Sequence, residues 1–172
     1  MPIVPDEKDW TWVLTRPCPE CSFDAATVTP STVPGSIENM LPRWRAVLRR
    51  PDAAERPDDS TWSALEYACH VRDVLSLFDQ RLNLMLDSDD ARFADWDQDR
   101  TAVEKDYANA DPALVSAELA AEGKQAAESF AAVRESEWDR KGLRSNGSEF
   151  TVLTLSRYFL HDLVHHLHDV NG

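Results

Sequence analysis

The stretch FLHDLVHHLHDV, residues 159–170, holds four of the five histidines in a chain of 172 residues. Its apolar residues recur at the three- and four-residue spacing of an amphipathic helix. The pattern begins near Thr151 and runs to about Val170, which predicts a long last helix. Because this helix combines a broad apolar face with a narrow polar one, we expect it to pack within a bundle of helices.

The distribution of proline divides the chain into two parts. Nine of the ten prolines precede residue 58, and only Pro112 follows it. Since proline interrupts helices, we expect residues 1–35 to form an irregular N-terminal extension and residues 36–172 to form a helical domain.

Three more helices are predicted upstream of the last one. Apolar spacing places them at residues 36–50, 60–86 and 112–134. Pro42 should kink the first helix or mark a late start of it, and Asp111 followed by Pro112 is typical of a helix start. Residues 87–99 read as an acidic loop, and residues 101–104, TAVE, have the capping-box pattern of a short helix. No strand pattern competes, so the expected fold is an all-α four-helix bundle.

Composition narrows the classes of function. The net charge is −13, from 31 acidic against 18 basic residues, which disfavours nucleic acids and anionic membranes as partners. No apolar run could span a membrane, no secretory signal is visible, and three cysteines do not suggest a disulfide framework. We therefore expect a cytoplasmic protein with a small-molecule substrate, and a homodimer remains open.

The histidines of the last helix form a stripe. His161 and His165 lie one above the other at i and i+4, His168 shares their sector, and His166 points away from it. The stripe contains no lysine, glutamate or glutamine, which would fill an ordinary solvent face. It is more typical of the lining of a polar pocket.

Two histidines at this spacing can hold one metal ion, and imidazole suits zinc, nickel, copper or iron. His70, in the middle of the second predicted helix, is the remaining histidine that could supply a third ligand. Three protein ligands leave an open, catalytic type of site. Glu66 and Asp73 share the side of His70 and could orient its ring or add an oxygen ligand. The alternative is a set of hydrogen-bonded core histidines.

WSALEYACHVRDV, residues 62–74, followed after a long gap by YFLHDLVHHLHDV, residues 158–170, resembles the DinB-like superfamily. This superfamily includes the YfiT-type proteins and the metal-binding domain of mycothiol-dependent maleylpyruvate isomerase. The resemblance covers residues 36–170. It implies a four-helix bundle of the up-down-down-up type with a divalent metal, often zinc or nickel, between the helices.

The resemblance further implies that His70, His161 and His165 are the metal ligands, although His168 could replace one of the last two. It implies a thiol-dependent transferase or isomerase, in which the metal lowers the pKa of a low-molecular-weight thiol such as mycothiol and the thiolate attacks an electrophile. Two alternatives stay open. One is a metal-dependent hydrolase with Glu66 or Asp73 as base, and the other is a non-enzymatic module that binds a metal or small ligand.

Three further residues are candidates for the reaction. Tyr67 and Asp73 flank His70 and could act as acid–base groups, although plain packing also explains Tyr67. Arg157 lies one turn before His161 and could bind a carboxylate of the thiol cofactor or the substrate. The alternative for Arg157 is a structural ion pair.

The extension carries a CxxC pair, Cys18 and Cys21, in RPCPECSF. Such a pair resembles half of a zinc knuckle, and Cys69, His166 or His168 could complete a closed site if the extension folds against the bundle. A redox-active pair and two reduced cysteines in a surface turn are the alternatives.

Overall fold

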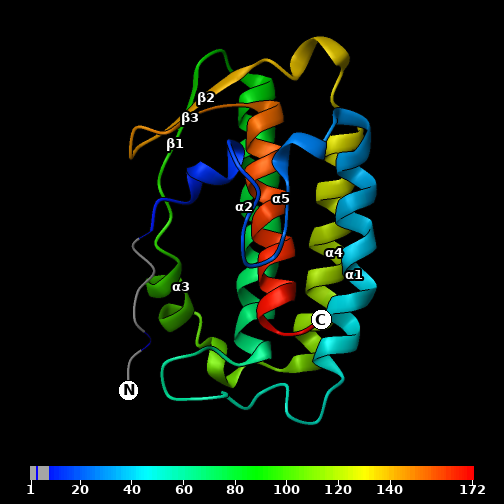
Figure 1. The fold of residues 1–172 in the computed structure, drawn as a ribbon, viewed down its shortest axis with the longest axis vertical. Coiled ribbons are helices and arrows are strands. Elements are labelled where there is room, and N and C mark those ends of the chain that lie inside the picture. Colours follow the sequence, from blue (N-terminus) through cyan, green and yellow to red (C-terminus); the bar gives the residue numbers. More distant parts are fainter. Residues whose placement is uncertain (1–2, 4–7) are drawn as a thin grey trace.

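The computed structural model describes residue 3 and residues 8–172 (Figure 1). Four long helices form the bundle, namely α1 (Val33–Leu48), α2 (Ala64–Asp87), α4 (Pro112–Ala131) and α5 (Val152–Asp169). In Figure 1, α2 and α4 run upward while α1 and α5 run downward. The second and third bundle helices are therefore parallel, and residues 88–111 must return along the molecule between them. The predicted four-helix bundle is confirmed.

Local capping explains where the helices begin. Thr151 caps α5 as predicted, with its hydroxyl accepting from the amide of Thr154 at 3.1 Å, and Asp111 caps α4. The helix α2 begins at Ala64 instead of residue 60. Ser63 and Glu66 form a reciprocal capping box there, in which the Glu66 carboxylate accepts from the Ser63 amide at 2.8 Å.

Three short strands were not predicted. They are β1 (Ala91–Phe93), β2 (Lys141–Arg144) and β3 (Glu149–Thr151). Strand β1 pairs with β2 in parallel and β2 pairs with β3 antiparallel, so Gly142 lies opposite both Ala91 and Phe150. Strands of three or four residues are too short to show an alternating pattern, and their pairing joins distant segments.

Two details of the helices also differ from expectation. The short helix α3 (Gln98–Glu104) begins after Asp97, which caps it, and not at the capping-box pattern of residues 101–104. The helix α1 continues through Pro42. A close approach of α1 to α4 depends on Gly123, because an added Cβ there would collide with the side chain of Leu41.

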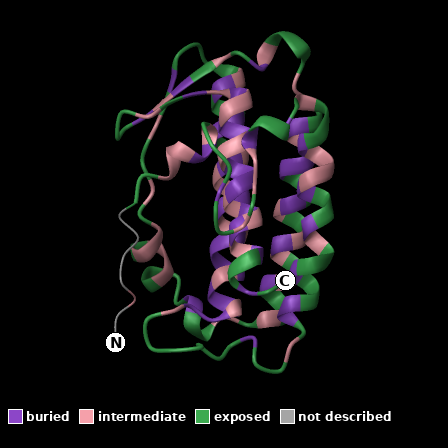
Figure 2. Ribbon diagram, viewed as in Figure 1, coloured by how far each residue is buried: buried purple, intermediate pink, exposed green. Residues whose placement is uncertain are grey.

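The core lies between the helices, and buried residues follow their inward faces in Figure 2. The helix α2 packs against α4 and α5, and α1 packs against the same two helices. Among the described residues, no helix combines the length and apolarity needed to cross a bilayer.

The N-terminal segment of residues 8–32, here called the leader, is packed against the bundle. It contains three short 3-10 helices, and it buries Val13, Cys18 and Ala25. Arg157 of α5 donates from Nε and Nη2 to the carbonyl oxygen of Val28, at 3.2 and 2.9 Å. The leader therefore forms part of the surroundings of α5 and of the polar residues on it.

Candidate metal sites

The polar residues of α5 use two neighbouring sides of the helix. His161 and His165 face the leader, while Asp162 and His166 face α2. Asp162 directly follows His161, and His166 directly follows His165. Successive side chains on an α-helix are rotated by about 100° around its axis, so the two pairs face different sides. Potential metal ligands therefore gather in two groups, and within each group the donor atoms lie within 4.8 Å of one another.

The first group consists of His70, Asp162 and His166, and we call it the open site. The Nε2 of His70 lies 3.4 Å from Oδ1 of Asp162, and the Nε2 of His166 lies 3.6 Å from the same oxygen. Both distances exceed those of good N–H···O hydrogen bonds. They match the separation of about 3.4 Å between two ligands of one tetrahedral ion with bonds near 2.0–2.1 Å.

Unpartnered atoms support this interpretation. His70 is fully buried, yet among the described residues neither of its ring nitrogens has a hydrogen-bond partner, and Oδ1 of Asp162 has none beyond its 3.4 Å contact with His70. Buried polar atoms without hydrogen bonds are costly and call for an explanation. A cation shared by His70, Asp162 and His166 would satisfy Nε2 of His70 and Oδ1 of Asp162, so the residues present fit a divalent metal.

Neighbouring groups hold these side chains in a metal-binding state. Asp169 accepts from Nδ1 of His166 at 2.9 Å, which directs Nε2 toward Asp162. Burial raises the pKa of Asp162, but the rings of His166 and His70 outweigh it and bring the pKa down to about 2. Burial lowers the pKa of His70. A carboxylate and a neutral imidazole are the forms that bind metal.

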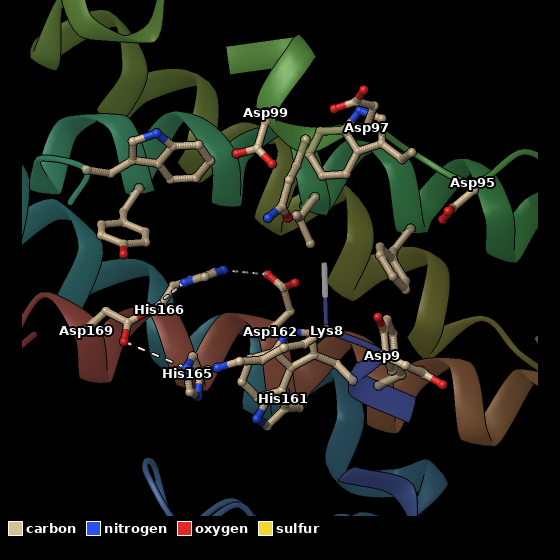
Figure 3. A pocket seen from close by; sticks show the side chains of 18 of the residues that line it. Lys8, Asp9, Asp95, Asp97, Asp99, His161, Asp162, His165, His166 and Asp169 are labelled. Carbon is tan, nitrogen blue, oxygen red and sulfur yellow. Dashed lines mark hydrogen bonds and ion pairs between the residues drawn. The ribbon is translucent and has the colours of Figure 1, made fainter. Parts of the chain in front are cut away.

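The open site borders a cavity of about 610 Å³. The residues that line it include Trp10, Trp62, Tyr67, Trp96, Asp162 and His166. Figure 3 shows Asp95, Asp97 and Asp99 on the wall opposite Asp162. Three protein ligands beside a cavity of this size leave room for a small molecule.

The second group consists of Cys18, Cys21, His161 and His165, and we call it the closed site. The predicted ligand set of His70, His161 and His165 is thus divided between the two sites. The reason is the packing of α5, because its side facing α2 carries Asp162 and His166.

Other predicted residues have structural partners. Asp73 accepts from the hydroxyl of Tyr107 at 2.5 Å and from Lys105 at 2.8 Å, outside the 610 Å³ cavity. Arg157 binds the leader at Val28. Glu66 is held by Arg56 and by the capping box, and His168 is exposed.

Tyr67 does line the cavity, and its ring centre lies 5.1 Å from that of His166. Sequence reasoning missed Asp162, His166 and Asp169. Asp162 and His166 also stand at i and i+4, so the signal was available in the same stretch of sequence.

Comparison with known proteins supports the fold. The family model of the DinB superfamily matches residues 35–170. Among solved structures, the chain is similar to YfiT from Bacillus subtilis, described as a probable metal-dependent hydrolase with an unusual four-helix bundle topology. The TM-score is 0.72 at 16% identity, over 83% of this chain and 86% of that one. No curated protein matches the sequence. The resemblance inferred from the histidine-bearing helices is confirmed, and the chain belongs to the DinB superfamily.

Proposed function

We propose that this protein is a metal-dependent enzyme acting on a small molecule, with His70, Asp162 and His166 as the ligands of a divalent ion, zinc or nickel. The observation that carries the proposal is the grouping of donor atoms from His70, Asp162 and His166 within 4.8 Å of one another. Asp162 and His166 line the 610 Å³ cavity, and His70 is buried directly behind them. The description of YfiT as a probable metal-dependent hydrolase is consistent with it.

The protein's own residues would prepare the reaction. A bound divalent ion supplies Lewis-acid chemistry and lowers the pKa of a thiol or water beside it. Asp169 holds the His166 ring in position. Trp62 and Trp96 pack on the ring of His70, with ring centres 5.6 and 5.3 Å away, and so keep water from that side.

Between the two reactions considered, we favour a thiol-dependent transferase or isomerase. An ordinary thiol has a pKa near 8.5, so a modest shift yields thiolate at neutral pH, whereas bulk water starts near 15.7. Hydrolysis therefore depends more on a carboxylate base. Glu66 and Asp73, the two predicted bases, are held by Arg56 and by Lys105 with Tyr107. The cavity is also large enough for a thiol and its acceptor together.

A metal-dependent hydrolase is the second candidate, because that is how YfiT is described. The carboxylates of the opposite wall, such as Asp99, would then have to act as the base in place of Glu66 or Asp73.

Calorimetric titration with low-molecular-weight thiols, mycothiol among them, tests the proposal. The protein should carry no affinity tag, and its metal content should be measured beforehand. We expect saturable thiol binding in the wild type and in the matched control His168→Gln, which changes an exposed histidine of the same helix. We expect none in His70→Ala.

Turnover then separates the candidates. Consumption of electrophilic substrates that requires thiol supports the transferase or isomerase. Ester or amide cleavage without thiol, lost in His70→Ala, would establish the hydrolase instead. Unchanged metal content in His70→Ala would contradict both.

A further inference from the structure

We propose that the closed site binds a structural zinc ion, which fastens the leader to α5. This site uses Cys18, Cys21, His161 and His165, and it shares no ligand with the open site. The inference therefore stands independently of the proposed function.

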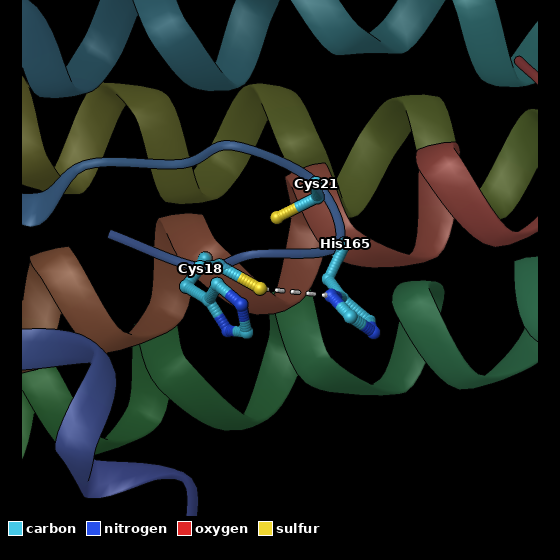
Figure 4. A group of neighbouring side chains, drawn as sticks. Cys18, Cys21 and His165 are labelled. Carbon is cyan, nitrogen blue, oxygen red and sulfur yellow. Dashed lines mark hydrogen bonds between the residues drawn. The ribbon is translucent and has the colours of Figure 1, made fainter. Parts of the chain in front are cut away.

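Donor geometry is the first support. The Sγ of Cys18 lies 3.7 Å from Nδ1 of His165. With Zn–S near 2.3 Å and Zn–N near 2.0–2.1 Å, a sulfur and a nitrogen ligand of one tetrahedral zinc lie about 3.6 Å apart. The Nε2 of His161 is buried, and no described residue forms a hydrogen bond with it. Figure 4 shows the cysteine side chains beside His165.

The backbone of the leader forms the turn that such a site needs. The amide of Cys18 donates to the carbonyl of Phe23 at 2.8 Å, and the amide of Ser22 donates to the carbonyl of Cys18 at 2.9 Å. Ser22 has φ 61°, in the left-handed region, directly after Cys21. This tight turn brings both sulfurs to one side of the chain, and both are free thiols.

The surroundings close the site. Cys18, His161 and His165 are buried, and the ring of Trp10 lies 5.5 and 5.1 Å from those of His161 and His165. The ring of Phe23 lies 5.6 Å from that of His161. His161 and His165 also line the 610 Å³ cavity, but four protein ligands complete a tetrahedral ion and leave no position for substrate on it. The site is therefore structural, and a set of two sulfurs and two nitrogens selects zinc.

Zinc binding would release the two thiol protons to solvent and satisfy all four donors.

The zinc also has a consequence for the cavity. The leader contains only short 3-10 helices, each of five residues or fewer, and it depends on other contacts for its position. Its Trp10 forms part of the cavity wall. The closed site would thus hold one wall of the pocket in place without entering the reaction.

The test begins with wild-type protein purified anaerobically, without a tag or chelator. A mercurial thiol reagent is titrated in the presence of a chromophoric zinc indicator. We expect one zinc ion per chain to be released as Cys18 and Cys21 react. A strong chelator should make both cysteines react faster with iodoacetamide, as read by peptide mass spectrometry. Alkylation rates that the chelator leaves unchanged, or a Cys18–Cys21 disulfide in the isolated protein, would overturn the proposal.

Variants then assign the zinc to its ligands. Cys18→Ser should lose the mercurial-releasable zinc, while Cys69→Ala, a change of the buried cysteine in α2, should keep it. Retention in Cys18→Ser would overturn the assignment. His70→Ala should keep this zinc, so failure of the open site and failure of the closed site give different results.

Discussion

Two neighbouring sides of one helix make different sites in this protein. His161 and His165 meet two sulfurs of the leader, whereas Asp162 and His166 meet one imidazole of α2, and all four residues line the same cavity. The first arrangement is complete with protein ligands, and the second leaves space for another molecule. The comparison teaches that the elements packed on each side of α5 decide whether a pair of ligands at i and i+4 becomes structural or reactive.

Removing the sulfurs of the closed site should have the largest effect on stability. The double substitution Cys18→Ser with Cys21→Ser removes the zinc-mediated cross-link between Cys18 and His165, which lie 147 positions apart in the chain. By the loop-closure argument used for cross-links, we expect the unfolding free energy to fall by about 5 kcal/mol. Urea denaturation in zinc-containing buffer measures it.

The matched substitution in the open site, His166→Gln, leaves the zinc link between the leader and α5 intact. It should therefore lower the unfolding free energy much less than the double cysteine substitution does. Equal losses in the two variants would mean that the leader is not held by metal.

The two sites should differ in how zinc affinity responds to pH. Zinc binding at the closed site expels two thiol protons, so its affinity should fall about 100-fold for each pH unit below neutrality. The open site has no thiol to deprotonate, and its Asp162, with a pKa of about 2, binds zinc as the carboxylate. The zinc affinity of the open site should therefore fall less steeply as the pH decreases.

Competition with chelators of known affinity between pH 6 and 8, in variants that keep one site each, gives both slopes. Parallel slopes would contradict the distinction between the sites.

Asp169 contacts one ligand of each site, so a change of Asp169 should affect the two sites differently. Its Oδ2 accepts from His166 Nδ1 at 2.9 Å, whereas its Oδ1 lies 3.7 Å from Nε2 of His165. We expect Asp169→Asn to weaken metal binding at the open site by about 10–100-fold, the usual effect of losing such an outer carboxylate. The closed site should change less, because the contact there is longer than a hydrogen bond. A larger loss at the closed site would reverse the roles assigned here.

The smallest expected effect lies outside both sites and provides a reference for acid stability. Burial raises the pKa of Glu66, but Arg56 and Ser63 outweigh it, so its pKa lies below the ordinary 4.5. Its contribution to folding is therefore complete above about pH 4.5 and is lost as the pH falls through the folded-state pKa.

The difference in unfolding free energy between the wild type and Glu66→Gln should shrink in acid. Urea denaturation with the metals chelated measures this difference. A difference that grows as the pH falls would contradict the direction of the shift.

Much of the bundle could be predicted because its signals are local. Asp111 before Pro112 and the cap at Thr151 identify helix starts within a few residues. The strands around Gly142 could not be predicted, because segments about 50 positions apart pair over three or four residues. The short helix after Asp97 was misplaced because two capping patterns lie close together.

The candidate sites depended more on packing. Spacing alone brings His161 and His165 together, but it cannot show that the leader lies on that side. For the same reason the sequence does not assign His166 to the metal site of His70, since it points away from the stripe of His161 and His165. Only the position of α2 shows that this direction leads to His70. Cys18 and Cys21 were recognised as half of a zinc site, and the fold supplied His161 and His165 as partners instead of Cys69, His166 or His168.

The closed site also orders events during synthesis. Cys18 and Cys21 precede every bundle helix, whereas His161 and His165 belong to the last one. At ribosomal rates the two thiols wait on the order of ten seconds for their partners. A nascent chain thus carries two exposed thiols that can join a complete zinc site only when α5 has emerged. The leader can then take its place at the cavity.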